Sequence, residues 1–305
     1  MVKALWIFPG QGGQRAGMLT HVPGPLRQHV EQLLGLKLLD TAQGYQDSVQ
    51  LQVSITLLQV SQVDQLIAAG ERPSLVAGHS LGVFAAAYAV GSLTRDDCFR
   101  LVKRRAELMQ AAYPQGYGMG VIVGLTRAAV TTLVEQVHTM THPVYVSNQN
   151  ASDQTAIAGE LIAIDQVLTL AKQAGAAKEL RLKVPVPSHS PLMAAVAEQL
   201  ASAAQATPIQ RPTGVYLANY SGHAARQAAK VRQDLVSNLV HPVYFEAMCQ
   251  VALNYQPDAI LNFAPGSPFR HVLQQDFGDL RQIDLNQTSL DDAQYLFNKW
   301  KRGTN

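Results

Sequence analysis

The segment Gly78-His79-Ser80-Leu81-Gly82 has the residue spacing that presents a serine hydroxyl for nucleophilic attack. A short apolar run, Leu75 to Ala77, precedes it, and an alanine-rich stretch from Phe84 to Val90 follows it. This order predicts a strand, a sharp turn and a helix, with glycines where side chains would collide at the turn. G-x-S-x-G also occurs by chance in long chains, but the flanking pattern favours the turn. Ser80 is therefore the candidate nucleophile.

A serine nucleophile needs a general base, and histidine suits that task best. His189 lies in Val184-Pro185-Val186-Pro187-Ser188-His189, where two prolines stiffen the chain and present the imidazole in a fixed place. His79 adjoins Ser80, but neighbouring side chains on a turn point apart, so we predict a structural role for it. We prefer His189 to three histidines in less constrained contexts, His223, His241 and His271.

Arg105 is the third candidate, because it interrupts an apolar face. Thr94 can cap a helix from Arg95 to Ala112, with acidic residues in its first turn. Apolar residues recur along that helix at steps of three and four, and Arg105 falls among them. A buried guanidinium must be paired or hydrogen-bonded. Two roles stay open: a structural one, in which the head pairs with a core carboxylate or reaches out to water, or the binding of an anionic substrate.

The elements around these residues indicate an α/β fold with an insertion. Residues 3–8 read as a buried strand that runs into the glycine-rich loop around Gln11, and 48–69 as a helix. From 118 to 184 the order is β-α-β-β-α-β, the ferredoxin-like unit, with Asn148-Gln149-Asn150 predicted as a turn. We therefore predict a large domain from 1–115 and 185–305, with 116–184 inserted as a small domain.

Composition places the chain among ordinary globular proteins, with 305 residues, 47% hydrophobic, and a net charge of +2. This charge argues against bulk nucleic-acid binding, and no run of about 18 apolar residues could span a membrane. The N-terminus lacks the layout of a signal peptide, so we predict a cytoplasmic location. Two cysteines, Cys98 and Cys249, are too few for a disulfide framework or a zinc site, and we predict buried thiols.

Four motifs stand in the order typical of the malonyl-CoA:acyl-carrier-protein transacylase family, which the sequence resembles over nearly its whole length. They are Phe8-Pro9-Gly10-Gln11-Gly12, the Ser80 segment, Arg105 with Met109-Gln110, and Val186-Pro187-Ser188-His189. The resemblance implies an α/β-hydrolase-like large domain with an inserted ferredoxin-like domain. It also implies malonyl-CoA and an acyl carrier protein as partners, and neither a metal nor a nucleotide cofactor.

The same resemblance assigns a role to each candidate. Ser80 would accept the acyl group, His189 would be its base, and Arg105 would grip the malonyl carboxylate. The resemblance further implies an oxyanion hole formed by the N–H groups of Gln11 and Leu81. The histidine would be oriented by the main-chain carbonyl of Asn238 instead of an acid.

Two features depart from the fatty-acid-synthesis members of that family. Those members usually carry Glu after the second glycine, where this chain has Val83-Phe84, and the segment before Ser80 looks shorter here. Both features are similar to the epsilon subunit of malonate decarboxylase, which loads malonyl onto the modified phosphopantetheine-type arm of that complex's carrier subunit. We therefore expect this carrier as acceptor, with the carrier protein of fatty-acid synthesis as the alternative.

Two other classes of function remain open. A serine esterase of the α/β-hydrolase type needs an Asp or Glu between Ser80 and His189 in chain order. The candidates, Asp153 and Asp165, fall inside the inserted unit, which argues against that class. A non-catalytic scaffold that binds a carrier domain would not require Ser80, His189 and Arg105 together.

Overall fold

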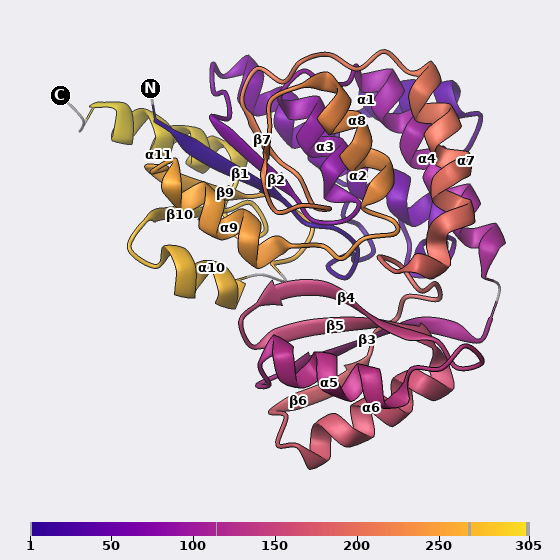
Figure 1. Cartoon of the computed structure of the whole chain (residues 1–305). Coiled ribbons are helices and arrows are strands. Elements are labelled where there is room, and N and C mark those ends of the chain that lie inside the picture. The colour runs from indigo at the N-terminus through magenta and orange to yellow at the C-terminus, as the bar shows by residue number, and fades with distance from the viewer. Residues whose placement is uncertain (1, 114, 268–269, 303–305) are drawn as a thin grey trace.

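The fold is built on two separate sheets, as the computed structural model of the chain shows in Figure 1. The structure describes residues 2–113, 115–267 and 270–302. Six strands form the larger sheet in the order β10-β9-β1-β2-β7-β8, and four form the smaller in the order β4-β5-β3-β6. The predicted fold class, a large α/β domain with a small ferredoxin-like one, is confirmed. The boundaries at 115/116 and 184/185 stay a prediction.

The larger sheet is parallel except at one edge, where β8 (Ala224–Ala225) runs antiparallel to its neighbour. The parallel strands are β1 (Ala4–Phe8), β2 (Leu75–Gly78), β7 (Val215–Leu217), β9 (Ala259–Asn262) and β10 (Arg281–Asp284). In β1, Trp6 and Phe8 belong to one buried cluster and Leu5 and Ile7 to another. Side chains alternate along a strand, so β1 contacts a core on each face of the sheet.

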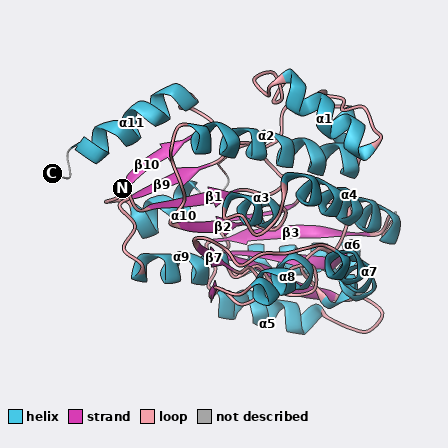
Figure 2. Cartoon of the chain, turned by 90° about the horizontal axis from the view of Figure 1, so that it is seen from above, coloured by secondary structure: helices cyan, strands magenta, loops and turns pink. Residues whose placement is uncertain are grey.

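Helices cover both faces of this sheet (Figure 2). One core is shared with α2, α3, α4 and α11, and the other with α9 and α10. The helices of the large domain are α1 (Gly24–Leu34), α2 (Ser48–Ala68), α3 (Gly82–Ala89), α4 (Arg95–Ala112), α7 (Ala194–Ala206), α8 (Ala228–Ser237), α9 (Phe245–Asn254), α10 (Arg270–Phe277) and α11 (Leu290–Arg302), with short 3₁₀ turns η1 (Gly44–Gln46) and η2 (Pro191–Met193).

The smaller sheet is antiparallel throughout and has the ferredoxin-like strand order. Its elements are β3 (Tyr117–Val123), α5 (Arg127–Val137), β4 (Val144–Ala151), β5 (Gln154–Glu160), α6 (Leu161–Gln173) and β6 (Lys178–Arg181). The predicted turn at Asn148-Gln149-Asn150 is wrong. These residues lie in β4, with register shifts, because pairing with β5 and a bridge from Asn148 to Val243 satisfy their backbone.

Other differences from the sequence prediction lie outside the inserted unit. The stretch 15–45, which carries little periodic pattern, contains α1. The residues 224–240 have a composition typical of a helix, but α8 begins only at Ala228, because Ala224–Ala225 pairs with β7 as an edge strand. Helix α10 was not predicted. The sequence Pro265-Gly266-Ser267-Pro268 is typical of a turn, but Pro268 lies outside the described residues.

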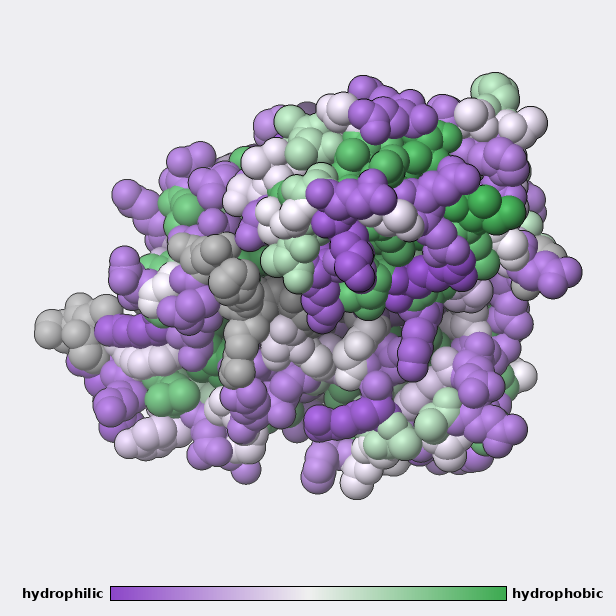
Figure 3. Space-filling model, turned by 90° about the horizontal axis from the view of Figure 1, so that it is seen from below, coloured by the Kyte–Doolittle hydropathy of each residue, from purple (hydrophilic) through white to green (hydrophobic). Residues whose placement is uncertain are grey.

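The cysteines and the other polar side chains of the described residues form neither a disulfide nor a metal site. Cys98 and Cys249 are free and buried, which confirms the prediction of buried thiols. Within the described ranges, no helix has the length and apolar character needed to cross a bilayer, and no group of His, Cys, Asp or Glu side chains gathers as a metal site. Hydrophilic side chains cover most of the face seen from below, with apolar patches between them (Figure 3).

Candidate active site

Ser80 sits on a strained turn at the carboxyl end of β2. Its φ is 52°, in the left-handed region that a residue with a side chain seldom adopts. A Cβ on Gly82 would lie 2.0 Å from the Phe8 carbonyl oxygen, and one on Gly78 would lie 2.3 Å from the Val83 nitrogen. Only glycine allows this approach, so the two flanking glycines let the turn pack against β1 and hold the serine outward.

His189 lies beside the serine hydroxyl. Its Nε2 is 2.8 Å from Ser80 Oγ, and its Nδ1 is hydrogen-bonded to the main-chain carbonyl of Asn238. A carbonyl can only accept, so the proton sits on Nδ1 and Nε2 is free to accept the serine proton. Burial, together with the nearby Arg105 charge, lowers the pKa of His189 to about 3, although the hydrogen bond to the Asn238 carbonyl opposes that shift. The ring is therefore neutral and able to act as a base.

The backbone of His189 is strained in the same way as that of Ser80. His189 has a φ of 62° and is 2% exposed. Strain of this kind persists only where surrounding contacts dictate the backbone, and it clusters at functional sites. Ser80 and His189, which both have a positive φ, thus face one another, although 109 positions separate them.

Neither the acidic residues considered as partners of His189 nor the other candidate histidines are found at this site in the described part of the chain. Asp165 is exposed and paired with Arg181, and Asp153 lies in the β4–β5 hairpin, so neither contacts the ring. His223 and His241 are exposed, and the side chain of His271 lies outside the described residues. The imidazole is oriented by a carbonyl, the arrangement that the resemblance implied for Asn238.

Arg105 points from α4 at the nucleophile. It is 1% exposed, its Nη2 lies 3.3 Å from Ser80 Oγ, and its Nη1 donates to Gln52 Oε1. Its Nε has no hydrogen-bond partner, and none of the ion pairs among the described side chains includes it. Burial lowers its pKa to about 10, so the guanidinium is still charged at neutral pH. A structural ion pair, the plainer of its two predicted roles, is absent from the described residues.

The Gln11 loop lies against the nucleophile turn. A Cβ on Gly10 would come within 2.8 Å of the His79 carbonyl oxygen and 3.6 Å of the Leu81 nitrogen. Gln59 Nε2 donates to the Pro9 carbonyl at 2.8 Å and fixes the start of the loop. The segments that carry the Gln11 and Leu81 N–H groups are thus neighbours beside Ser80, although their role as an oxyanion hole stays a prediction.

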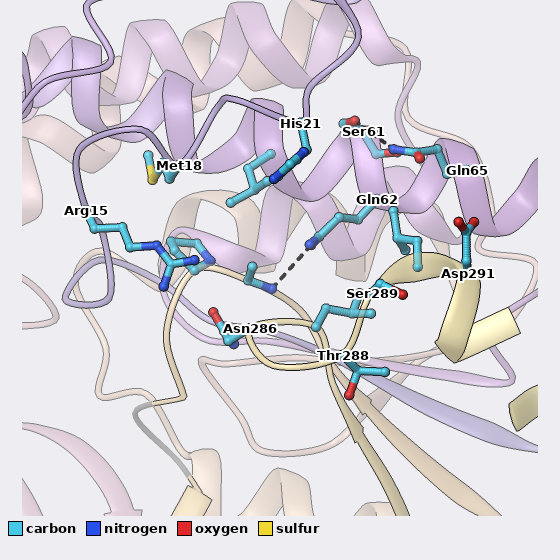
Figure 4. Close-up of a pocket in the computed structure, with 15 residues that line it drawn as sticks. Arg15, Met18, His21, Ser61, Gln62, Gln65, Asn286, Thr288, Ser289 and Asp291 are labelled. Atoms are coloured by element: carbon cyan, nitrogen blue, oxygen red, sulfur yellow. Dashed lines mark hydrogen bonds between the residues drawn. The ribbon is translucent and has the colours of Figure 1, made fainter. Parts of the chain in front are cut away.

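Ser80 and His189 open onto a pocket of about 290 Å³ between the two sheets. The smaller sheet contributes both apolar side chains, Met119, Val121 and Ala156, and polar ones, Asn148, Asn150 and Gln154. The lining also includes Gln11, Leu182, Val184 and Ser188. A second cavity, of about 370 Å³, is lined by the segment 15–21, by α2 and by the segment 285–291 (Figure 4), and its lining includes neither Ser80 nor His189. There Gln62 Oε1 accepts the Ala264 N–H, and we assign none of the acyl chemistry to it.

Sequence reasoning missed two residues that hold the site together. Asn219 accepts the Ser80 N–H at 2.8 Å through Oδ1 and donates to the Gly78 carbonyl through Nδ2. Gln52, in the second turn of α2, accepts a hydrogen bond from the guanidinium of Arg105. Asn219 follows the short apolar run 215–218, which contains β7, and the carboxyl ends of parallel strands collect functional side chains. This run is the signal that could have found it. For Gln52 the signal was a polar residue among the apolar residues of the predicted helix 48–69.

His79 is held by side chains of the smaller sheet and also lines the pocket. Its Nε2 lies 3.1 Å from Asn150 Oδ1 and 3.3 Å from Asn148 Nδ2, both on β4, and its ring meets Phe245 edge-on. Burial lowers the pKa of His79 to about 4, so the ring is neutral. It therefore links the nucleophile turn to the small domain.

Most of the chain matches one family of known proteins. The acyl transferase domain family matches residues 5–292. The malonyl CoA-acyl carrier protein transacylase of Haemophilus influenzae is 31% identical over 308 residues, 95% of this chain and 97% of that protein. FabD of Acinetobacter baumannii is 29% identical and superposes with a TM-score of 0.90, over 97% of this chain and 98% of that one.

A second similar structure is a complex between a type II PKS acyl-carrier protein and its malonyl-transacylase. It is 28% identical, with a TM-score of 0.88 over 94% of this chain and 97% of that chain. The family match begins in β1, includes both sheets and the whole of the Ser80 site, and ends in α11. The chain therefore belongs to the acyl transferase domain family and is an acyltransferase.

Proposed function

We propose that the chain is a malonyltransferase. It would move malonyl from malonyl-CoA, through an acyl-Ser80 intermediate, to the phosphopantetheine-type thiol of an acyl carrier protein. The relatives named above carry this substrate and acceptor in their names. One observation of this chain supports malonyl over a neutral acyl group: the guanidinium of Arg105 beside the serine hydroxyl.

The charge balance of the site explains why that observation matters. Removing one partner from a buried ion pair costs about 3–5 kcal/mol, because a buried charge is left uncompensated. Arg105 is held by one neutral amide, Gln52, and retains an N–H without a partner. A substrate carboxylate would supply the missing charge and accept two parallel hydrogen bonds from the guanidinium. The acyl group would then lie with its carbonyl toward Ser80 and its carboxylate toward Arg105.

The first half-reaction forms the acyl-serine. Ser80 Oγ attacks the thioester carbonyl while His189 Nε2 takes the hydroxyl proton. The oxyanion of the tetrahedral intermediate accepts hydrogen bonds from the N–H groups of Gln11 and Leu81. The carbon–sulfur bond then breaks, and His189 returns its proton to the sulfur, so CoA leaves as a thiol.

The second half-reaction runs the same steps in reverse. The carrier thiol gives its proton to His189 Nε2 and attacks the acyl-serine, and Ser80 takes the proton back as the ester bond breaks. The kinetics should therefore be ping-pong. Transfer competes with hydrolysis, so the apolar side chains that the smaller sheet places over the pocket would serve to exclude water.

The choice of carrier rests on finer features. Val83 and Phe84, which stand where fatty-acid-synthesis members usually carry Glu, are fully buried in the core of the large domain. This departure thus concerns the packing of α3 and is weak support for the malonate decarboxylase carrier. The names of the relatives favour the alternative, a malonyl-CoA:acyl-carrier-protein transacylase of the fatty-acid type. Transfer rates from the malonyl enzyme to each of the two carriers would decide between them.

Mass spectrometry after incubation with malonyl-CoA tests the proposal. A malonyltransferase gains a stable malonyl group on Ser80 and loses it when an acyl carrier protein in its thiol form is added. Steady release of malonate without carrier would instead indicate an esterase. A protein that stays unmodified would be a carrier-binding scaffold, and the proposal would be wrong.

We expect His189→Ala to slow both half-reactions by about 10²-fold or more, because general-base catalysis is lost from Nε2. The measurements are the rate of acylation by malonyl-CoA and the rate of transfer from the acyl-enzyme. His241→Ala, which changes an exposed histidine, is the matched control and should stay at the wild-type rate. Acylation of His189→Ala at the wild-type rate would show that another group is the base.

The pH dependence of acylation should reflect the lowered pKa of His189. The base works when neutral, so activity is lost as pH falls through its folded-state pKa. Burial moves that pKa from 6.5 to about 3. We therefore expect kcat/KM with malonyl-CoA to stay flat from about pH 8 down to about pH 5. A decline centred near 6.5 would show a histidine in contact with water.

A further inference from the structure

Asp234 is a fully buried carboxylate that the chemistry above does not use. It lies in α8 and is 0% exposed. Its Oδ2 accepts the hydroxyl of Tyr216 at 2.7 Å, and its Oδ1 accepts the backbone N–H of Tyr220 at 3.0 Å. Burial raises the pKa of Asp234 to about 7, and the hydrogen bonds from Tyr216 and from the backbone oppose that rise. Burying a carboxylate without hydrogen-bond donors costs free energy, so the contacts of Tyr216 and Tyr220 with Asp234 hold their segment against α8.

One branch of contacts leads from this carboxylate to the nucleophile. Tyr216 belongs to β7 and Tyr220 to the loop that follows, and Asn219 lies between them. Asn219 accepts the Ser80 N–H at 2.8 Å and donates to the Gly78 carbonyl. The segment anchored by Asp234 is thus the segment that holds the nucleophile turn on both sides.

A second branch leads from the same residue to the base. The main-chain carbonyl of Asp234 accepts the Asn238 N–H at 3.1 Å and the Asn238 side-chain amide at 2.6 Å. Asn238 follows the last residue of α8, and its own carbonyl accepts the Nδ1–H of His189. The last turn of α8 (Figure 1) therefore fixes the direction of the carbonyl that orients the imidazole.

We propose that Asp234 is a positioning residue, which sets the Ser80–His189 geometry by tying the loop after β7 to the last turn of α8. The inference rests on the proposed function to the extent that Ser80 is the nucleophile and His189 its base. The loop holds one member of the pair and the helix end orients the other, so slippage between them changes the 2.8 Å contact directly. Misplacement by 1 Å can slow a reaction about 10²-fold, so a smaller shift should be visible in the rate.

The test removes the link without touching the pair itself. Tyr216→Phe deletes one donor to Asp234 and keeps the ring, and Asp234→Asn keeps the shape of the side chain. The matched control is Tyr88→Phe, because the Tyr88 hydroxyl donates to Asp64 and joins α3 to α2 in the same way. For each protein one measures the melting temperature, kcat and KM with malonyl-CoA and carrier, and the rate at which a fluorophosphonate labels Ser80.

We expect Tyr216→Phe and Asp234→Asn to lower kcat and the labelling rate by about tenfold, with KM changed less than about twofold. Tyr88→Phe should keep kcat and labelling within about twofold at a comparable loss of melting temperature. If the folded Tyr216→Phe matches Tyr88→Phe, or loses activity only through KM, Asp234 is a structural link and the inference is wrong. Should Asp234→Asn fail to fold, Tyr216→Phe decides alone.

Fluorophosphonate labelling separates this inference from the proposed function. The reagent reports the nucleophilicity of Ser80 whatever acyl group the site prefers. A wild-type protein that is labelled but never malonylated would contradict the malonyl proposal, and the comparison of labelling rates among variants would still decide the role of Asp234.

Discussion

Ser80→Ala should abolish acylation while leaving the fold intact. Without the hydroxyl there is no atom to carry the malonyl group, so no mass increase should appear with malonyl-CoA. The Ser80 contacts that shape the turn are made by its backbone, whose N–H is held by Asn219 at 2.8 Å, and alanine keeps them. The strain of a side chain at φ 52°, about 1–2 kcal/mol, is the same for serine and alanine.

The measurements for this variant are the intact mass after incubation and the melting temperature. Ser188→Ala is the matched control, because Ser188 lines the same pocket, while the two ring nitrogens of His189 are hydrogen-bonded to Ser80 and Asn238 and not to Ser188. It should still gain one malonyl group. A malonyl adduct on Ser80→Ala would place the nucleophile elsewhere, and unfolding of Ser80→Ala would mean that the hydroxyl is part of the fold.

Arg105→Ala should change the substrate preference, and this is the second large effect that we expect. Wild type should accept malonyl-CoA and react poorly with acetyl-CoA, because acetyl leaves the buried guanidinium without its counter-charge. Sites built around a polar contact can reject analogues that lack it by up to about 10⁴-fold. In Arg105→Ala, malonyl transfer should fall about 10²-fold or more, while acetyl transfer holds or rises.

The test is kcat/KM for both thioesters in wild type, Arg105→Ala and Arg105→Lys. Lysine should rescue only in part, because a single ammonium group cannot donate two parallel bonds to a carboxylate. Arg104→Ala, one position away and exposed, is the control and should match wild type. Equal losses with malonyl and acetyl in Arg105→Ala would make Arg105 structural and remove the main support for a malonyl enzyme.

The sequence by itself determined the local parts of the site. The helix predicted at Arg95–Ala112 has those bounds in the structure, with Thr94 capping it through the Asp97 N–H. Arg105 is buried as its periodicity predicted. The glycines around Ser80 predicted its turn for a steric reason that the structure repeats. Each of these features depends on residues within one or two turns of the chain, where spacing and side-chain volume decide.

The tertiary structure alone decided how the parts meet. Three hydrogen bonds build the site: Ser80 to His189, His189 to the Asn238 carbonyl, and the Ser80 N–H to Asn219. They join residues that are 49 to 139 positions apart in the sequence, and no local pattern encodes contacts over such separations. The error at Asn148-Gln149-Asn150 has the same cause. Three polar residues in a row are typical of a turn, but pairing with β5 and side-chain contacts to His79 make them a strand. Short-range preferences of about 1 kcal/mol yield to hydrogen bonds and burial that exist only once distant segments have packed.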